Sequence, residues 1–452
     1  MKDQSLDILK KEAFMQTRHR FFKKLWAQIW LCCTAVFLIQ CADPMEAIEA
    51  ETLTSVHPNN ENANVTLLAP TLSNGSLYEI SVPDGWDQQN LVLFAHGWVS
   101  TLCPPHIPDL SINGTSVEDI ISNTGAAVAR IGYYKTGLPE ADKVIEDLVE
   151  LVEVFETTTG VAPANVILSG VSLGGLITVL ALEQHPEIFD GGLAACGPYG
   201  DFQKEVNYLG DFFVLFKYYF DDILDGLGID IGNPTGIPLT TQNGWEQCVT
   251  DPGTGEVIVE NQPGPVQLAL LNAITSNPAH LKLFEKVLKV AEVPLPSNPT
   301  TAELLEAAQG IFRLNILGTN DINNLLGGIP FGNTDRLYGL KALSKGIINF
   351  REFRALNKLS GGVQRISATA TVDPFITSGK LDNPVVTLHT TLDPTQPFWH
   401  ALIYRAKTLS KGSGLKNSIV AVDEFGHCDF TVEEVLKAFE RLQILMALDE
   451  IL

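Results

Sequence analysis

One serine of the chain stands in a context that is typical of a nucleophile. Residues 170–174 read GVSLG and fit the pattern G-x-S-x-G, with Ser172 at the centre. A β-type run precedes the motif and a helical run follows it, so the pattern predicts a tight turn from a strand into a helix. Glycines beside the serine leave the strained backbone of such a turn room to form. We predict Ser172 as the nucleophile; the alternative is a serine that only caps a glycine-rich helix.

A histidine in a second glycine-containing loop is the candidate base. Residues 424–428 read EFGHC and lie between the last strand pattern and the final helical pattern. Such a loop places an imidazole at the carboxyl edge of the sheet, where it can accept the proton of Ser172. We predict His427 as this base. His389 is the main competitor because it ends another strand pattern, and we interpret it as packed or lining a pocket.

Alternating strands and helices have to position these residues. Continuous apolar runs such as residues 91–95 (LVLFA) are typical of strands buried on both faces. Residues 139–157 place apolar side chains at three- and four-residue spacing and predict an amphipathic helix. The alternation predicts an α/β protein with a mostly parallel, three-layer α/β/α sheet. The strand patterns lie at residues 64–68, 77–82, 91–95, 126–131, 165–168, 192–195, 384–388 and 418–422, with further helical patterns at 173–184 and 432–448.

The alternation stops between residues 199 and 380. Helix-like stretches occur there near residues 266–290, 301–315 and 334–356. An aromatic cluster over residues 208–220 either lines an acyl or aryl pocket or forms the insertion's own core. One sheet with one large helical insertion explains the pattern better than three serial domains.

With these motifs in this order, the chain resembles the α/β-hydrolase superfamily over residues 64–198 and 381–452. Residues 94–98 (FAHGW) look like the H-G segment that follows the third core strand of that family. The resemblance implies that the amides of Trp98 and Leu173 hold the oxyanion, which makes His96 a structural member of the turn. It also implies that residues 199–380, inserted after the sixth core strand, form a helical cap over the active site.

The resemblance further implies the chain order serine, acid, histidine for a catalytic triad. Asp393 follows the strand at residues 384–390, where the family keeps its acid, and we expect it to orient His427. Asp373 and Asp382 precede that strand, and we interpret them as turn residues beside proline or asparagine.

The expected activity is hydrolysis of carboxylic esters, esterase- or lipase-like, through an acyl-enzyme intermediate. The substrate would be a small-molecule or polymeric ester. A peptidase or amidase of the same fold is an alternative, and so is a non-catalytic cell-surface binding protein. The sequence contains no zinc spacing, P-loop or dinucleotide fingerprint, so we expect no cofactor and no metal.

Composition excludes some partners. The chain has 452 residues, is 45% hydrophobic and has a formal net charge of -23. This apolar content is too high for a disordered chain, and the negative charge repels phosphate backbones. We therefore expect a folded protein that does not bind nucleic acid.

The N-terminal sequence predicts export. Residues 18–24 (RHRFFKK) are basic and residues 25–39 carry no charge, which is the layout of a bacterial-type signal. We expect a signal or lipoprotein leader over residues 1–41 and a polar tether over residues 42–63. Residues 38–41 (LIQC) resemble a lipobox, so lipidation of Cys41 and simple cleavage both remain open. The enzyme would be secreted or anchored at the outer membrane or cell surface.

The cysteine count leaves the disulfides open. Of seven cysteines, three lie within the expected leader. The resemblance extends in part to tannase- and feruloyl-esterase-type hydrolases, in which the cysteine after the histidine bonds a cysteine before the nucleophile; that position here is Val171. We expect Cys428 to stay a buried thiol, with a bond to Cys196 as the alternative. Cys103 and Cys248 could bridge core and cap.

Overall fold

The computed structural model describes residues 63–69, 71–86, 88–253 and 256–449. The expected leader (1–41) and all but the last residue of the expected tether (42–63) lie outside the described residues. Within the described part, no helix combines the length and the apolar composition that crossing a membrane requires.

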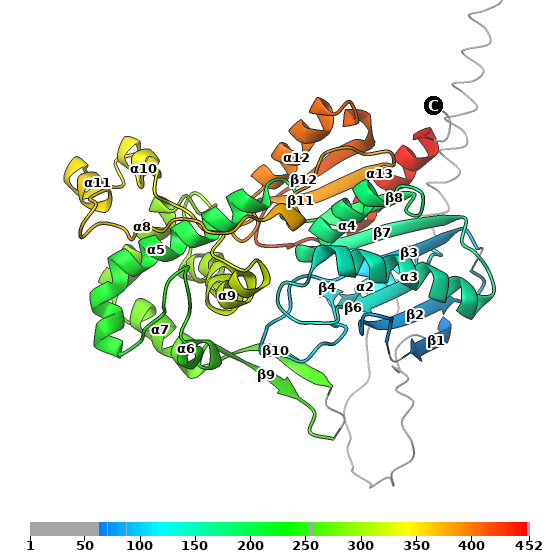
Figure 1. Ribbon diagram of the computed structural model, residues 1–452, viewed down its shortest axis with the longest axis horizontal. Coiled ribbons are helices and arrows are strands. Elements are labelled where there is room, and N and C mark those ends of the chain that lie inside the picture. Colours follow the sequence, from blue (N-terminus) through cyan, green and yellow to red (C-terminus); the bar gives the residue numbers. More distant parts are fainter. Residues whose placement is uncertain (1–62, 70, 87, 254–255, 450–452) are drawn as a thin grey trace, which may run out of the picture. The chain divides into compact units, whose positions relative to one another are not determined.

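An eight-stranded sheet runs in the order β1-β2-β6-β3-β7-β8-β11-β12 (Figure 1). The pairs β1–β2 and β2–β6 are antiparallel, and the other neighbours are parallel. The mostly parallel sheet that the sequence predicts is therefore confirmed. The strands are β1 (Ala63–Ala69), β2 (Leu77–Pro83), β3 (Asn90–Ala95), β6 (Ala127–Gly132), β7 (Asn165–Val171), β8 (Gly191–Ala195), β11 (Val385–Leu392) and β12 (Asn417–Phe425).

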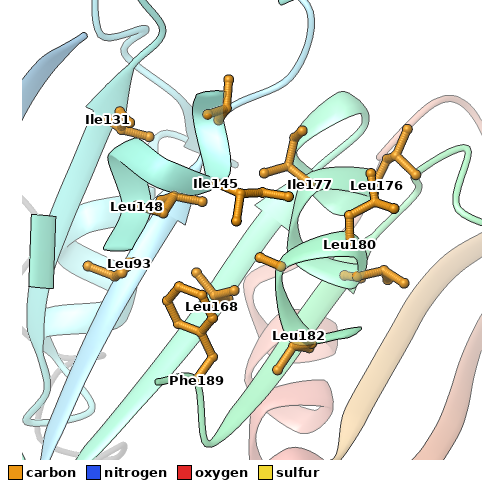
Figure 2. Close-up of a cluster of buried hydrophobic side chains, with 14 of the residues drawn as sticks. Leu93, Ile131, Ile145, Leu148, Leu168, Leu176, Ile177, Leu180, Leu182 and Phe189 are labelled. Atoms are coloured by element: carbon orange, nitrogen blue, oxygen red, sulfur yellow. The ribbon is translucent and has the colours of Figure 1, made fainter. Parts of the chain in front are cut away.

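The sheet is covered on both faces, as the unbroken apolar runs predict. In β3, Leu91 and Leu93 belong to one buried cluster, whereas Val92 and Phe94 belong to another on the opposite face. The helices α3 (Ala141–Thr159), α4 (Leu173–Gln184) and α12 (Trp399–Ser410) contribute to the first cluster, part of which Figure 2 shows. The second cluster includes side chains of α2 (Val117–Ser122) and α13 (Val432–Asp449). These are the three expected layers.

Helix α3 shows how the sequence pattern produces this packing. Its buried apolar positions include Val144, Leu148, Leu151 and Phe155, which repeat at three- and four-residue spacing. Burying each of the larger side chains contributes about 1.5–3 kcal/mol. The helix ends at Gly160, whose φ of 72° is the left-handed conformation that glycine adopts without strain.

A large insertion follows β8, the sixth strand of the sheet along the chain. Most of it is helical, but it also contains the antiparallel hairpin β9–β10, which the sequence patterns did not predict. Figure 1 shows its helices grouped apart from the sheet. The elements are α5 (Phe202–Leu227), α6 (Leu239–Asn243), β9 (Glu246–Thr250), β10 (Val257–Pro263), α7 (Pro265–Thr275), α8 (Pro278–Val290), α9 (Thr301–Leu325), α10 (Leu340–Ser344), α11 (Phe350–Leu356) and the 3-10 helix Asp373–Phe375.

The insertion has its own hydrophobic core. Phe212, Phe216 and Phe220 of α5 are buried and make edge-to-face contacts with Phe284 of α8 and Phe312 of α9. Most of the aromatic cluster at residues 208–220 is therefore core of the insertion rather than lining of a pocket. The prediction of one continuous helical stretch at 266–290 is wrong in detail, because Asn277 caps α8 and Pro278 begins it.

Two disulfides connect distant segments. Cys103, in the loop after β3, bonds Cys248 of β9 with their Cα atoms 5.2 Å apart. Cys196, directly after β8, bonds Cys428 with their Cα atoms 5.5 Å apart. The expectation that Cys428 stays a thiol is wrong. Since β8 and β12 both flank β11, their carboxyl ends lie close enough for the bond.

Candidate active site

Ser172 lies on a strained turn between β7 and α4. Its backbone has φ 53° and ψ -119°, a region that side-chain-bearing residues rarely adopt. A Cβ on Gly170 would stand 2.2 Å from the carbonyl oxygen of Gly174, and a Cβ on Gly174 would stand 2.0 Å from that of Ala95. Both glycines are therefore required for the close approach. Ser172 makes no side-chain cap to the helix, contrary to the capping alternative.

The three candidate triad residues meet at the carboxyl edge of the sheet. His427 Nε2 lies 3.0 Å from Ser172 Oγ, and His427 Nδ1 lies 2.8 Å from Asp393 Oδ2. A carboxylate can only accept here, so Nδ1 carries the proton and Nε2 is left to accept one from the serine. The segments that follow β7, β11 and β12 supply one residue each.

Asp393 is fully buried and fixed by its own turn. Its Oδ1 accepts hydrogen bonds from the amides of Thr395 and Gln396, both at 2.8 Å. Its Oδ2 accepts the bond from His427. Both carboxylate oxygens are thus bonded, which offsets the cost of burying the charge.

The two competing histidines are packed in the interior and bonded to other groups, although His389 Nε2 also lies 3.7 Å from Asp393 Oδ2. His389 is buried; its Nε2–H donates to the Gln396 carbonyl at 2.6 Å, and its Nδ1 accepts from the Tyr199 hydroxyl at 3.0 Å. Burial lowers the pKa of His389. His96 stacks on Tyr133 at 3.9 Å between ring centres and its carbonyl accepts from the Tyr133 hydroxyl. Both have the packing roles that the sequence indicated.

The two acids upstream of β11 lie in turns. Asp373 begins a 3-10 helix and accepts from the Thr371 hydroxyl at 2.7 Å. Asp382 is exposed and lies 3.7 Å from the Lys380 ammonium. Neither hydrogen-bonds a triad candidate in the described chain.

The predicted oxyanion residues line the same pocket as the serine. Trp98 and Leu173 border this pocket together with Ser172. A Cβ on Gly97 would stand 3.2 Å from Ser172 Cβ, so the loop after β3 runs directly beside the serine. The register pairs Ala95 of β3 with Gly170 of β7, which brings the two following turns side by side. Two amides in this position are suited to an oxyanion.

The pocket extends from Ser172 between α5 and α9 and encloses about 820 Å³ of empty space, part of it open to solvent. One face of each helix borders it, at positions spaced by three or four residues, and most of the lining side chains are apolar. The lining residues from the two helices are Phe202, Glu205, Val206, Leu209, Gly210, Leu314, Asn315, Gly318, Thr319, Ile322 and Asn323.

Sequence reasoning missed a buried acid in this lining. Glu205 is 2% exposed, and its Oε2 accepts a hydrogen bond from His400 Nε2–H at 2.9 Å. His400 Nδ1 accepts from the amides of Gly200 and Asp201, which fixes the proton on Nε2. Burial raises the pKa of Glu205 well above its usual value and lowers that of His400. The only signal in the sequence is an acidic residue within the apolar spacing of α5.

One group of metal-ligating residue types lies in the described chain. Ligand atoms of Cys196, His427 and Cys428 are within 4.8 Å of one another. The two sulfurs form a disulfide, so neither is a thiolate that could bind a metal.

The Prolyl oligopeptidase family model matches residues 123–201, which include β6, α3 and the serine turn. The chain has the fold of the α/β hydrolases. The chain departs from the tannase and feruloyl-esterase pattern, because Cys428 bonds Cys196 rather than a residue before the serine.

Several solved structures are similar to this chain. Pyrococcus horikoshii acylaminoacyl peptidase is 10% identical with a TM-score of 0.37; the match covers 86% of this chain and 42% of the peptidase. Carboxyl esterase 2 from Tuber melanosporum is 12% identical with a TM-score of 0.38, covering 90% and 91%. Est1E from Butyrivibrio proteoclasticus is 10% identical with a TM-score of 0.36, covering 86% and 99%. No curated protein sequence matches significantly.

Proposed function

We propose that the protein is an exported serine hydrolase that cleaves carboxylic esters through an acyl-enzyme intermediate. The hydrogen-bond chain from Ser172 through His427 to Asp393 supports this proposal most directly. The largely apolar pocket beside Ser172 suits an uncharged ester. The match to the Prolyl oligopeptidase family favours a second candidate, a peptidase or amidase that uses the same residues.

In the proposed reaction, Ser172 Oγ attacks the ester carbonyl carbon while His427 Nε2 accepts the serine proton. The carbonyl oxygen becomes an oxyanion that accepts hydrogen bonds from the amides of Trp98 and Leu173. The carbon–oxygen bond to the alcohol then breaks, and the alcohol leaves with the proton from His427. Water attacks the acyl-enzyme by the same steps, releasing the acid and regenerating Ser172.

A fluorophosphonate reagent tests the nucleophile. We expect a covalent mass increase on Ser172 in the folded wild type and no labelling of Ser172→Ala. A folded wild type that is not labelled would favour the non-catalytic binding protein. Hydrolysis rates on matched 4-nitrophenyl esters and 4-nitroanilides then separate the two enzyme candidates, since a preference for anilides would favour the amidase.

The proposal includes export of the enzyme from the cytoplasm. Its support is the basic and apolar N-terminal sequence together with the two disulfides, which form in oxidising compartments. In a bacterial host, globomycin sensitivity and a lipid mass on Cys41 would indicate a lipoprotein. A cleaved, unmodified N-terminus would contradict lipidation and support a secreted enzyme.

A further inference from the structure

Four buried polar side chains, Glu205, Asn315, Thr319 and Gln396, border the largely apolar pocket beside Ser172, and two of them keep an oxygen without a partner in the described chain. Glu205 is 2% exposed and Gln396 is 5% exposed, and both line the pocket. Glu205 Oε1 and Gln396 Oε1 have no hydrogen-bond partner among the residues that the structure describes. A buried oxygen without a partner is costly, and two of them beside one cavity indicate a ligand that supplies hydrogen bonds.

Neighbouring residues hold Glu205 in place. Its other oxygen accepts from His400 Nε2–H, and the amides of Gly200 and Asp201 donate to the far side of the same imidazole. The carboxyl therefore has one oxygen bonded to the protein and one oxygen left over. Because burial favours the uncharged forms of both Glu205 and His400, the pair offers the pocket a hydroxyl-like group rather than a charge.

Gln396 is fixed by the turn that carries Asp393. Its amide donates to Asp393 Oδ1 at 2.8 Å, and its carbonyl accepts from His389 Nε2–H at 2.6 Å. The backbone of Gln396 is thus tied to the candidate triad acid, while its side chain borders the pocket. Hydrogen bonds therefore hold the carboxyl of Glu205 and the backbone of Gln396 in place.

The lining of the pocket indicates which half of the substrate it holds. The alcohol has to leave within reach of His427 Nε2, because that nitrogen returns the proton. The pocket borders Ser172, Leu173 and Trp98, but His427 is not among its lining residues. This arrangement suits the acyl group, which stays on Ser172 when the alcohol departs.

We propose that the pocket selects an uncharged acyl group whose apolar chain lies between α5 and α9 and which carries a hydroxyl that hydrogen-bonds Glu205 and Gln396. This inference rests on the proposed function. A hydroxyl fits because it can both donate to Gln396 Oε1 and accept from a protonated Glu205. An ammonium group would instead need an ionised partner.

Matched 4-nitrophenyl esters test the hydroxyl. Acyl chains of four, six and eight carbons are compared, each with a terminal methyl, hydroxyl or ammonium group. In the wild type we expect the hydroxyl ester to exceed its methyl counterpart in kcat/KM by about tenfold or more at one chain length. A preference for methyl at every length, or for ammonium, would overturn the proposal.

Variants of the two polar residues assign that preference. Glu205→Leu should abolish it, whereas Glu205→Gln, which can still accept from His400 and donate to a hydroxyl, should retain part of it. Gln396→Leu should weaken the preference for the hydroxyl ester while leaving the Glu205–His400 hydrogen bond intact. This second variant keeps the proposal testable if Glu205→Leu does not fold. A hydroxyl preference that survives in both leucine variants would contradict the assignment.

Two glycines provide a matched test of the acyl position. A Cβ on Gly318 of α9 or on Gly226 of α5 would meet no atom within 4 Å, yet only Gly318 is among the residues lining the pocket. Gly318→Phe should lower the ratio of octanoate to acetate hydrolysis about tenfold or more, and Gly226→Phe should leave it unchanged. Equal ratios in both variants would place the acyl chain elsewhere.

These results separate the inference from the proposed function. If wild-type Ser172 is labelled by the fluorophosphonate and hydrolyses 4-nitrophenyl acetate, the serine hydrolase assignment stands whatever the acyl preferences are. If the wild type shows neither labelling of Ser172 nor hydrolysis of 4-nitrophenyl acetate, the serine hydrolase and the acyl pocket are rejected together. Labelling and acetate hydrolysis without the hydroxyl preference would reject the acyl selectivity alone.

Discussion

The candidate triad and the wall of the neighbouring pocket differ in how their buried polar groups are satisfied. Asp393 has both oxygens hydrogen-bonded, and both ring nitrogens of His427 have partners. In the pocket wall, Glu205 and Gln396 each keep a buried oxygen without a partner in the described chain. The two regions meet at a single turn, since Gln396 also donates its amide to Asp393.

The candidate triad forms its hydrogen bonds before substrate binds, whereas the pocket wall keeps oxygens that a substrate can bond. The reactive groups are oriented before substrate arrives, so little reorganisation is needed when charge develops. Each unsatisfied oxygen in the pocket costs about 1–3 kcal/mol of folding free energy, which a bound ligand can offset. The hydrogen bonds of the candidate triad are therefore complete without a ligand, whereas under our proposal an acyl group completes those of the pocket.

Removing the charge of Asp393 should produce the largest loss in the complete region. Asp393→Asn keeps the shape but favours the wrong tautomer of His427, so we expect kcat to fall by about 10⁴-fold. Ester hydrolysis under saturating substrate measures this loss. Asp382→Asn is the matched control on an exposed turn, and it should leave kcat unchanged. A comparable loss in the control would show that the triad acid is misplaced.

The sequence predicts this region well because its chemistry depends on local patterns. Ser172 and His427 each follow a strand and have a glycine within two residues, so both could be placed at one edge of the sheet. The continuous apolar run of β3, residues 91–95, predicted a sheet that is covered on both faces. The β9–β10 hairpin was missed because its residues carry many polar side chains and no strict alternation. The helix α12 was missed as well.

The pocket could not be predicted in the same way. Glu205 and His400 are 195 residues apart, and nothing local to either one indicates the other. Likewise, Cys428 and Cys196 bond across 232 residues because their strands flank β11, a relation that only the strand order reveals. Long-range polar pairs depend on tertiary packing rather than on periodicity, so they require the fold first.

Removing the disulfide next to His427 should lower kcat less than Asp393→Asn does. Cys428 follows His427 directly, so the double variant Cys196→Ser/Cys428→Ser should release the loop and lower kcat by about 10- to 100-fold. KM should change less, because the acyl pocket keeps its lining. Steady-state initial rates of the folded, purified variants measure kcat and KM.

The control is the other disulfide. Cys103→Ser/Cys248→Ser removes a bond between the loop after β3 and the insertion, and it should mainly lower stability, by about 2–4 kcal/mol. If both double variants lower kcat equally, the Cys196–Cys428 bond has no special part in positioning His427.

The smallest expected effect concerns stability, and it tests whether Glu205 is uncharged. Burial raises the pKa of Glu205 in the folded protein, so its contribution is fully present below the unfolded pKa of about 4.3 and is lost as pH rises through the folded value. Glu205→Gln cannot ionise and avoids that loss. Urea unfolding should therefore show the variant gaining free energy of unfolding relative to wild type as pH rises from 5 to 8.

An exposed acid with the opposite shift is the control for this experiment. Lys437 beside Glu433 lowers the pKa of Glu433, so the difference between Glu433→Gln and wild type should stay flat above pH 5 and change only in more acidic solution. A flat difference for Glu205→Gln as well would mean that Glu205 is ionised in the folded protein. The pocket would then present a negative charge, and an acyl group with a cationic substituent would fit it better than one with a hydroxyl.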